Sequence, residues 1–127
     1  MTEAVLDSSA VLAFLQNEPG REVVEPLLCV SVISSVNLAE VVTKLIDRGS
    51  PAEQAHVKVD TLPFRIAAAS PASGTSAGLL HAQTRRRGLS LGDRFCLALA
   101  METGLPVLTA DRAWTELGLD LDIRLIR

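Results

Sequence analysis

The chain has 127 residues, of which 48% are hydrophobic and only 3% aromatic, and its formal net charge is −3 at pH 7. This composition excludes a disordered chain and predicts a single domain over residues 1–127 with an aliphatic core. No apolar run reaches the roughly 18 residues of a membrane span.

The N-terminus lacks the basic and apolar segments of a secretory signal, so we expect a cytoplasmic protein with no membrane partner. Two cysteines, Cys29 and Cys96, lie in apolar sequence and are expected to be buried free thiols. Because the cysteines and the two histidines are scattered, the sequence does not indicate a zinc site.

In chain order, apolar and β-branched runs alternate with helical patterns. The expected strands are residues 4–6, 29–33, 64–68, 107–109 and 123–126, and the expected helices are 8–18, 22–28, 36–48, 52–62, 77–87 and a short helix at 113–117. Residues 88–100 begin with a polar stretch that contains two glycines and continue as an almost wholly apolar helix, which ends at Gly104. Residues 70–78, rich in Ser, Gly and Pro, are expected to be a mobile surface loop. In the helix at 36–48, the helical spacing predicts an apolar face of Val36, Ala39, Val42, Thr43 and Ile46.

Strands separated by helices predict an α/β sandwich around a mostly parallel sheet. In such sheets, ligands bind at the carboxyl ends of the strands. Asp7 directly follows the first strand and Asp111 follows the strand at 107–109, so both are expected at the same edge. Each is equally well explained as an ordinary helix N-cap.

Two further acids lie near this edge. Glu40 lies beside the apolar face of its helix and Asp93 in the first turn of the buried helix. Taken alone, Glu40 suits a solvated helix position and Asp93 suits the helix dipole. Taken together, clustered carboxylates without His or Cys suit Mg²⁺, or Mn²⁺, and such ions promote phosphodiester hydrolysis.

The motifs LDSSA, NLAE, GLSLGDR and LTADRAW, in this order over nearly the whole chain, resemble the PIN-domain ribonucleases, and specifically the VapC toxins of type II toxin–antitoxin modules. The resemblance implies a three-layer α/β/α fold with a central parallel sheet and an acidic, Mg²⁺-dependent site that cuts RNA. It also implies a homodimer and a VapB-type antitoxin that covers the site.

Carried over to this sequence, the resemblance places the catalytic and metal-binding acids at Asp7, Glu40, Asp93 and Asp111. Ser9 and Thr109 match hydroxyl residues beside the first and last acids. Asn37, one helical turn before Glu40, is expected to position it by hydrogen bonding.

The only basic run, Arg85, Arg86 and Arg87, is expected to contact RNA phosphates or an acidic partner segment, or to be a solvated helix C-terminus. Arg94 and Arg112 each follow a site acid, so they either hold substrate phosphate or pair with a carboxylate. For the antitoxin, the candidate contacts are Val11, Leu12 and Leu15 and the apolar face of the Glu40 helix, with core packing as the competing use.

Two other functions remain as alternatives. A non-catalytic binding module would keep the fold without the chemistry. An aspartate-based phosphatase or phosphotransferase would use Asp7 as nucleophile, but the haloacid-dehalogenase type needs a second Asp at position 9, which is Ser9 here, and a receiver domain needs an acid pair at the first strand end.

Overall fold

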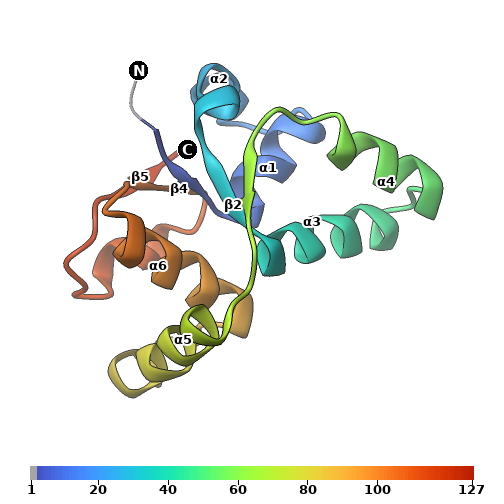
Figure 1. Cartoon of the computed structure of the whole chain (residues 1–127). Coiled ribbons are helices and arrows are strands. Elements are labelled where there is room, and N and C mark those ends of the chain that lie inside the picture. Colours follow the sequence, from blue (N-terminus) through green and yellow to red (C-terminus); the bar gives the residue numbers. More distant parts are fainter. Residues whose placement is uncertain (1–2) are drawn as a thin grey trace.

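The computed structural model, which describes residues 3–127, contains a five-stranded sheet in the order β3-β2-β1-β4-β5 (Figure 1). The strands are β1 (Val5–Leu6), β2 (Val32–Ser34), β3 (Arg65–Ala67), β4 (Val107–Thr109) and β5 (Ile123–Leu125). Every neighbouring pair is parallel, with Val5 opposite both Val32 and Val107. The expected parallel sheet is confirmed.

Helices connect the strands and cover both faces of the sheet (Figure 1). The α-helices are α1 (Ser8–Leu15), α2 (Arg21–Val24), α3 (Ser35–Asp47), α4 (Ala52–Asp60), α5 (Pro71–Thr84) and α6 (Leu91–Thr103), and the two 3₁₀ helices are η1 (Glu25–Val30) and η2 (Arg112–Glu116). Among residues 3–127, we find no helix with the length and apolar character to cross a membrane.

Two hydrophobic clusters lie on opposite faces of the sheet because successive strand residues point to opposite sides. Leu6, Ile33 and Leu108 pack with α1, α3 and α4 on one face. Val5 and Val107 pack with α5, α6 and η2 on the other. The molecule is therefore a three-layer α/β/α sandwich, as expected.

Helix α3 buries a different face from the one that the spacing predicted. Its buried residues are Asn37, Val41 and Leu45, whereas Ala39 and Ile46 are exposed. The predicted apolar face differs from the buried one because the buried row begins with a polar residue, Asn37, whose side-chain NH₂ donates two hydrogen bonds.

The segment 70–78 is helical, so the predicted mobile loop is wrong. Ser70 caps α5 by accepting a hydrogen bond from the Ser73 backbone (3.0 Å), and the Ser73 hydroxyl accepts one from the Ser70 backbone (2.7 Å). Pro71 stands at the first helical position, where its missing N–H is not needed. The sequence signature was a capping box with Ser in place of Glu. The helix consequently covers 71–84 rather than 77–87.

The strand predicted at 29–33 begins three residues later, at Val32, because Cys29 and Val30 belong to η1. Cys29 is therefore exposed, which contradicts the expectation that it is buried, whereas Cys96 is buried; both thiols are free. The other predicted strands and helices are present with shifts of a few residues at their ends.

Candidate active site

The sheet has its switch point between β1 and β4, where the strand order changes direction. Helix α1, which follows β1, packs on one face of the sheet, and η2, which follows β4, packs on the other. In open α/β sheets, ligands bind beside such a point, at the carboxyl ends of the strands. Asp7 follows β1 and caps α1, and its Oδ1 accepts a hydrogen bond from the Ser8 backbone (2.9 Å). Only 4% of Asp7 is exposed, so the cap is also a buried carboxylate at the switch point.

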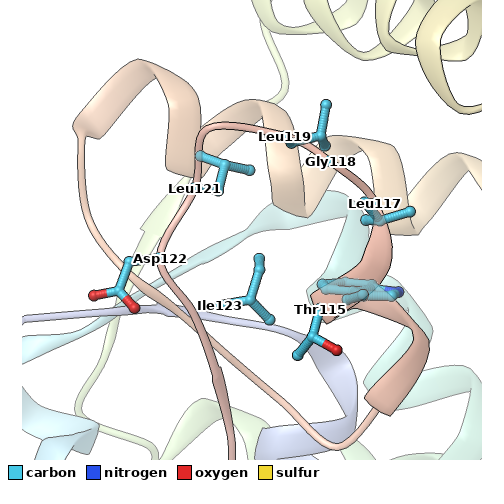
Figure 2. A pocket seen from close by; sticks show the side chains of 8 residues that line it. Thr115, Leu117, Gly118, Leu119, Leu121, Asp122 and Ile123 are labelled. Atoms are coloured by element: carbon cyan, nitrogen blue, oxygen red, sulfur yellow. The ribbon is translucent and has the colours of Figure 1, made fainter.

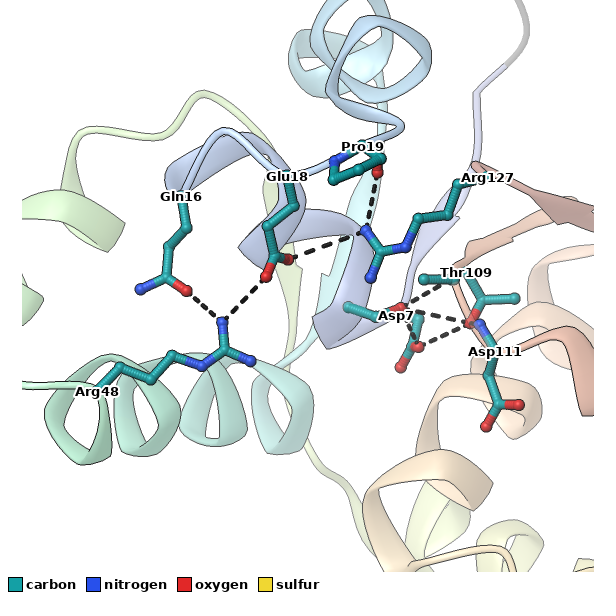
Figure 3. A network of polar contacts seen from close by, with 10 residues as sticks. Asp7, Gln16, Glu18, Pro19, Arg48, Thr109, Asp111 and Arg127 are labelled. Carbon is teal, nitrogen blue, oxygen red and sulfur yellow. Dashed lines mark hydrogen bonds and ion pairs between the residues drawn. The ribbon is translucent and has the colours of Figure 1, made fainter.

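Two hydroxyl groups fix the other oxygen of Asp7. Ser9 and Thr109 both donate to Oδ2, at 2.6 and 2.8 Å, and Figure 3 shows the bond from Thr109. Each hydroxyl in turn accepts a hydrogen bond from the backbone. The Ala110 N–H donates to Ser9 (2.9 Å), and the Asp111 N–H donates to Thr109 (3.0 Å). Because each hydroxyl proton is directed at Asp7, the network is arranged for an ionised carboxylate that accepts three hydrogen bonds.

Asp93 enters from α6. Ser90 caps this helix by accepting from the Asp93 backbone (3.1 Å), and Asp93 Oδ2 accepts from the Ser90 backbone (2.9 Å). This is a reciprocal capping box. One oxygen of the half-buried carboxylate is thus held by the cap, and the other makes no hydrogen bond among the described residues.

Glu40 is held by α3 and α6 together. The side-chain amide of Asn37, itself fully buried, donates to Glu40 Oε1 (2.8 Å) and to the backbone carbonyl of Gly92 (2.9 Å). The Glu40 carboxylate lies against the Cα of Gly92, in space that any side chain at position 92 would fill. Asn37 therefore positions Glu40, as expected, but through a contact with α6 that spacing along α3 did not reveal.

These acids influence one another. Burial raises the pKa of Asp7, opposed by the Ser9 and Thr109 hydrogen bonds, and the negative charges of Asp93 and Glu40 raise it further. The pKa of the buried Cys96 thiol is raised well above its ordinary value, first by burial and then by the charges of Asp7, Asp93 and Glu40. The charges of Asp93 and Glu40 thus reach Asp7, and an added cation near Asp7 would offset them.

The fourth acid, Asp111, lies apart from the other three. Its carboxylate caps η2 by accepting from the Ala113 backbone (3.0 Å), and the residue is exposed. Figure 3 shows this carboxylate turned away from Asp7, to which Asp111 is linked only through its backbone N–H and Thr109.

The donors have the oxygen chemistry that Mg²⁺ and Mn²⁺ prefer, and the buried Asp7 carboxylate with two acids beside it is an environment that favours a cation. In residues 3–127, no three His, Cys, Asp or Glu side chains stand close enough together to hold one ion. Asp7 is held by three hydrogen bonds, so binding would require the side chains of Glu40 or Asp93 to move toward it.

The arginines that follow the acids do not form ion pairs with them. Arg94 donates to the backbone carbonyl of Ala77 (3.0 Å) and so joins α6 to α5. Arg112 is exposed and makes no ion pair among residues 3–127. Pairing with the site carboxylates, one of the two expected roles, is therefore absent in the described part of the chain.

The PIN domain family model matches residues 4–119. The chain belongs to the PIN domain family. The fold is also similar to three solved structures of bacterial proteins. One is a DNA-bound VapBC from Salmonella typhimurium, with 21% sequence identity over 100% of both chains and a TM-score of 0.77. Another is a toxin–antitoxin complex from Klebsiella pneumoniae, with 16% identity over 98% of both chains and a TM-score of 0.76. The third is VapC20 from Mycobacterium tuberculosis, a Sarcin-Ricin loop cleaving toxin, with 17% identity over 91% of this chain and 95% of that chain and a TM-score of 0.75. No match was found among the curated proteins.

The roles of two residues near the acids of this PIN domain were not predicted from the sequence. Gly92, in the first helical turn, was regarded only as punctuation, although it makes room for Glu40. Cys96, one turn after Asp93, was assigned to the core without its acidic surroundings. The position of Gly92 inside the predicted helix, directly before Asp93, was the signal for the first, because a glycine inside a helix usually has a packing reason.

A separate hollow of about 280 Å³ lies between η2 and β5 (Figure 2). Leu117, Leu119, Leu121 and Ile123 line it beside the buried Trp114, together with the polar Thr115 and Asp122. None of the candidate site residues of this PIN domain lines it, so the candidate active site is the set of acids at the carboxyl ends of β1 and β4 and not this hollow.

Proposed function

We propose that this PIN domain is a metal-dependent endoribonuclease, and that it acts as a VapC-type toxin neutralised by a VapB-type antitoxin. The observation that carries the proposal is the buried Asp7 at the switch point, with its pKa raised by burial and by Asp93 and Glu40. Burying an ionisable carboxylate lowers the stability of the folded protein, and carboxylates with pKa values perturbed in this way cluster at functional sites.

Asp7, Glu40, Asp93 and Asp111 are the proposed ligands of Mg²⁺, with Mn²⁺ as the alternative; for Asp111 this requires its carboxylate to leave the cap of η2 and turn toward Asp7. When bound, a divalent ion supplies Lewis acidity and lowers the pKa of a water that attacks the RNA phosphate. Asp7 contributes a fixed carboxylate because Ser9, Thr109 and the Ser8 backbone hold both of its oxygens. Asn37 keeps Glu40 against α6, and the free oxygen of Asp93 remains open toward a ligand.

The test is RNA cleavage by the purified protein with Mg²⁺, with Mn²⁺ and with EDTA. We expect cleavage that EDTA abolishes, and losses of about 100-fold or more for Asp7→Asn and Asp93→Asn. Asp60→Asn, an exposed aspartate at the end of α4, is the matched control. Unchanged cleavage in either site variant would overturn the assignment.

The toxin role rests on the solved complexes that the fold resembles, which include VapBC and FitAB assemblies. Val11 and Leu12 are buried in the core, so they are not free for a partner. The exposed side of α3, with Val36, Ala39 and Lys44 around a groove of about 430 Å³ that includes Glu40, is the better candidate for the antitoxin. A homodimer is proposed on the same likeness.

Co-expression with the protein encoded beside it tests this part. We expect a stable complex that no longer cleaves RNA, and growth arrest when the chain is expressed alone. A chain that is monomeric and harmless when expressed alone would contradict the toxin and dimer proposals while leaving the nuclease proposal to the cleavage assay.

One observation favours the non-catalytic alternative, namely that three carboxylates do not converge on one point in residues 3–127. A calorimetric titration with Mg²⁺ and Mn²⁺ separates the two functions, because a binding module would give no heat of binding. The phosphatase alternative is weakened by Ser9, whose hydroxyl donates to Asp7 Oδ2 and so occupies the oxygen that would attack phosphorus.

A further inference from the structure

Charge is divided unevenly along the chain. Residues 61–92 contain four of the twelve basic residues and none of the fifteen acidic residues, so this segment is positive within an acidic protein. It includes β3, α5 and the turn that leads into α6. One of its arginines, Arg65, is paired with Glu3 at 3.7 Å.

The other three arginines of the segment have no acidic partner. Arg85, Arg86 and Arg87 are all exposed and make no ion pair among residues 3–127. With Ala82 and Gln83 they line a surface hollow of about 470 Å³. We call this hollow the arginine hollow. The dipole of α5 favours a positive charge at Arg85, which is the C-cap of the helix. Arg86 and Arg87 lie beyond the helix, so the dipole does not explain why positive charge is placed there.

A short connection joins the arginine hollow to Asp93, one of the site acids. Gly88, at φ 69°, reverses the chain after Arg87, and Ser90 then caps α6 with Asp93 in its first turn. Arg87 and Asp93 are six positions apart in the chain, which limits their Cα separation to about 20 Å. The hydrogen bond from Arg94 to the Ala77 carbonyl joins α5 to α6, so the helix that ends at the arginine hollow is held against the helix that carries Asp93.

We propose that the arginine hollow binds the phosphate backbone of the RNA beside the bond that is cut; this rests on the proposed ribonuclease function. Adjacent unpaired guanidinium groups repel one another and are satisfied together by a polyanion. The absence of acids from residues 61–92 removes repulsion of phosphates along the same side. Because these contacts are to phosphate, they supply affinity and orientation without sequence preference.

The test is the salt dependence of binding to a fluorescently labelled single-stranded RNA 12-mer of mixed sequence, measured by anisotropy in EDTA. Each phosphate contact on a single strand contributes a slope of about −0.7 in log K against log salt. The variant Arg85→Gln/Arg86→Gln/Arg87→Gln should therefore reduce the slope by about 2 and weaken binding about 100-fold near 0.1 M salt. The control Lys58→Gln/Arg124→Gln/Arg127→Gln removes the same charge from α4 and the C-terminal end, and should leave the slope unchanged.

Binding in EDTA is read separately from cleavage, so a failure of the ribonuclease proposal does not hide the result. Equal slopes for the two triple variants would overturn the RNA-binding inference even if the protein cleaves RNA. A change in sedimentation of the arginine variant with unchanged RNA affinity would overturn it in favour of a protein contact. The substitution of all three arginines by lysine keeps the charge and should restore most of the slope, which excludes misfolding as the cause.

Discussion

The Glu40 carboxylate lies in the space that a Cβ on residue 92 would occupy. An ideal Cβ built on Gly92 would approach all three atoms of this carboxyl group to less than 3.0 Å, a distance that real Cβ atoms essentially never show. The amide of Asn37 closes the arrangement by donating to both Glu40 and the Gly92 carbonyl. Two helices that are far apart in sequence thus share one acidic side chain.

We expect Gly92→Ala to move the Glu40 carboxylate away from Asp7, because the added methyl group and the carboxylate cannot occupy the same space. RNA cleavage and the affinity for Mg²⁺ should each fall by about tenfold or more, while circular dichroism shows a folded protein. Gly78→Ala is the matched control, since it is also a helical glycine but nothing lies within 4 Å of its added Cβ. That control should be neutral or more stable by about 0.5–1 kcal/mol. Full Mg²⁺ affinity in Gly92→Ala would show that Glu40 is not required in its present position.

Asn37 is expected to stabilise the fold as well as the site. Asn37→Ala leaves the buried Gly92 carbonyl without its side-chain donor and should lower the free energy of unfolding by about 1–3 kcal/mol. Asn37→Asp should cost more at pH 7, because it places a second carboxylate against Glu40. Urea unfolding measures both, with the exposed Gln83→Ala expected to stay within about 0.5 kcal/mol of the parent. An Asp variant as stable as the Ala variant would contradict this electrostatic explanation.

The raised pKa of Asp7 makes the stability of the metal-free protein depend on pH. In the folded state Asp7 keeps its proton to a higher pH than in the unfolded state, where its pKa is about 3.9. Between these two values the folded state binds more protons, so stability falls as pH rises and the loss is complete above the folded pKa. The difference in unfolding free energy between wild type and Asp7→Asn, measured in EDTA from pH 4 upward, should show this slope. A difference that is independent of pH, or that rises with pH, would contradict it.

Divalent ions should offset this pH-dependent loss of stability in the wild type but not in Asp7→Asn. An ion that binds the folded state at 100 times its Kd adds about 2.7 kcal/mol to the unfolding free energy. We expect Mg²⁺ or Mn²⁺ to raise the melting temperature of the wild type at pH 7 and to have little effect on Asp7→Asn. Equal shifts in the two proteins would place the ion elsewhere.

The two cysteines should differ in reactivity. Cys29 is exposed, whereas Cys96 is fully buried and its raised pKa keeps the thiol protonated. Iodoacetamide at pH 8, followed by mass spectrometry, should label Cys29 in the native protein and label Cys96 only as fast as the protein opens. Cys29→Ser is the matched control, which should remain almost unlabelled until urea is added. Equal labelling of both thiols in the native state would mean that the region beside Asp7 is open to solvent.

The sequence alone was enough to predict the layers and the position of Asp7, because short apolar runs alternating with helices allow few arrangements other than a parallel sheet with helices on both faces. The family resemblance pointed to the hydroxyl residues Ser9 and Thr109 beside the first and last acids, and both donate to Asp7. The prediction from sequence was wrong where the composition of a segment is typical of a loop but its structure is helical. The Ser/Gly-rich 70–78 segment is helical because of a Ser–Ser capping box and the packing of α5 on α6.

Tertiary structure decided how the acids are related. The sequence placed all four carboxylates in one site, with Asp7 and Asp93 as the leading metal ligands, but Asp111 caps η2 and faces away, whereas Asp93 and Glu40 raise the pKa of Asp7. The contact of Glu40 with Gly92 joins residues 52 positions apart, and spacing along one helix carries no information about what another helix brings to it. Local pattern therefore determines which residues form each element and which end of the sheet holds the acids, whereas the packing of α3 against α6 determines how close their charges come.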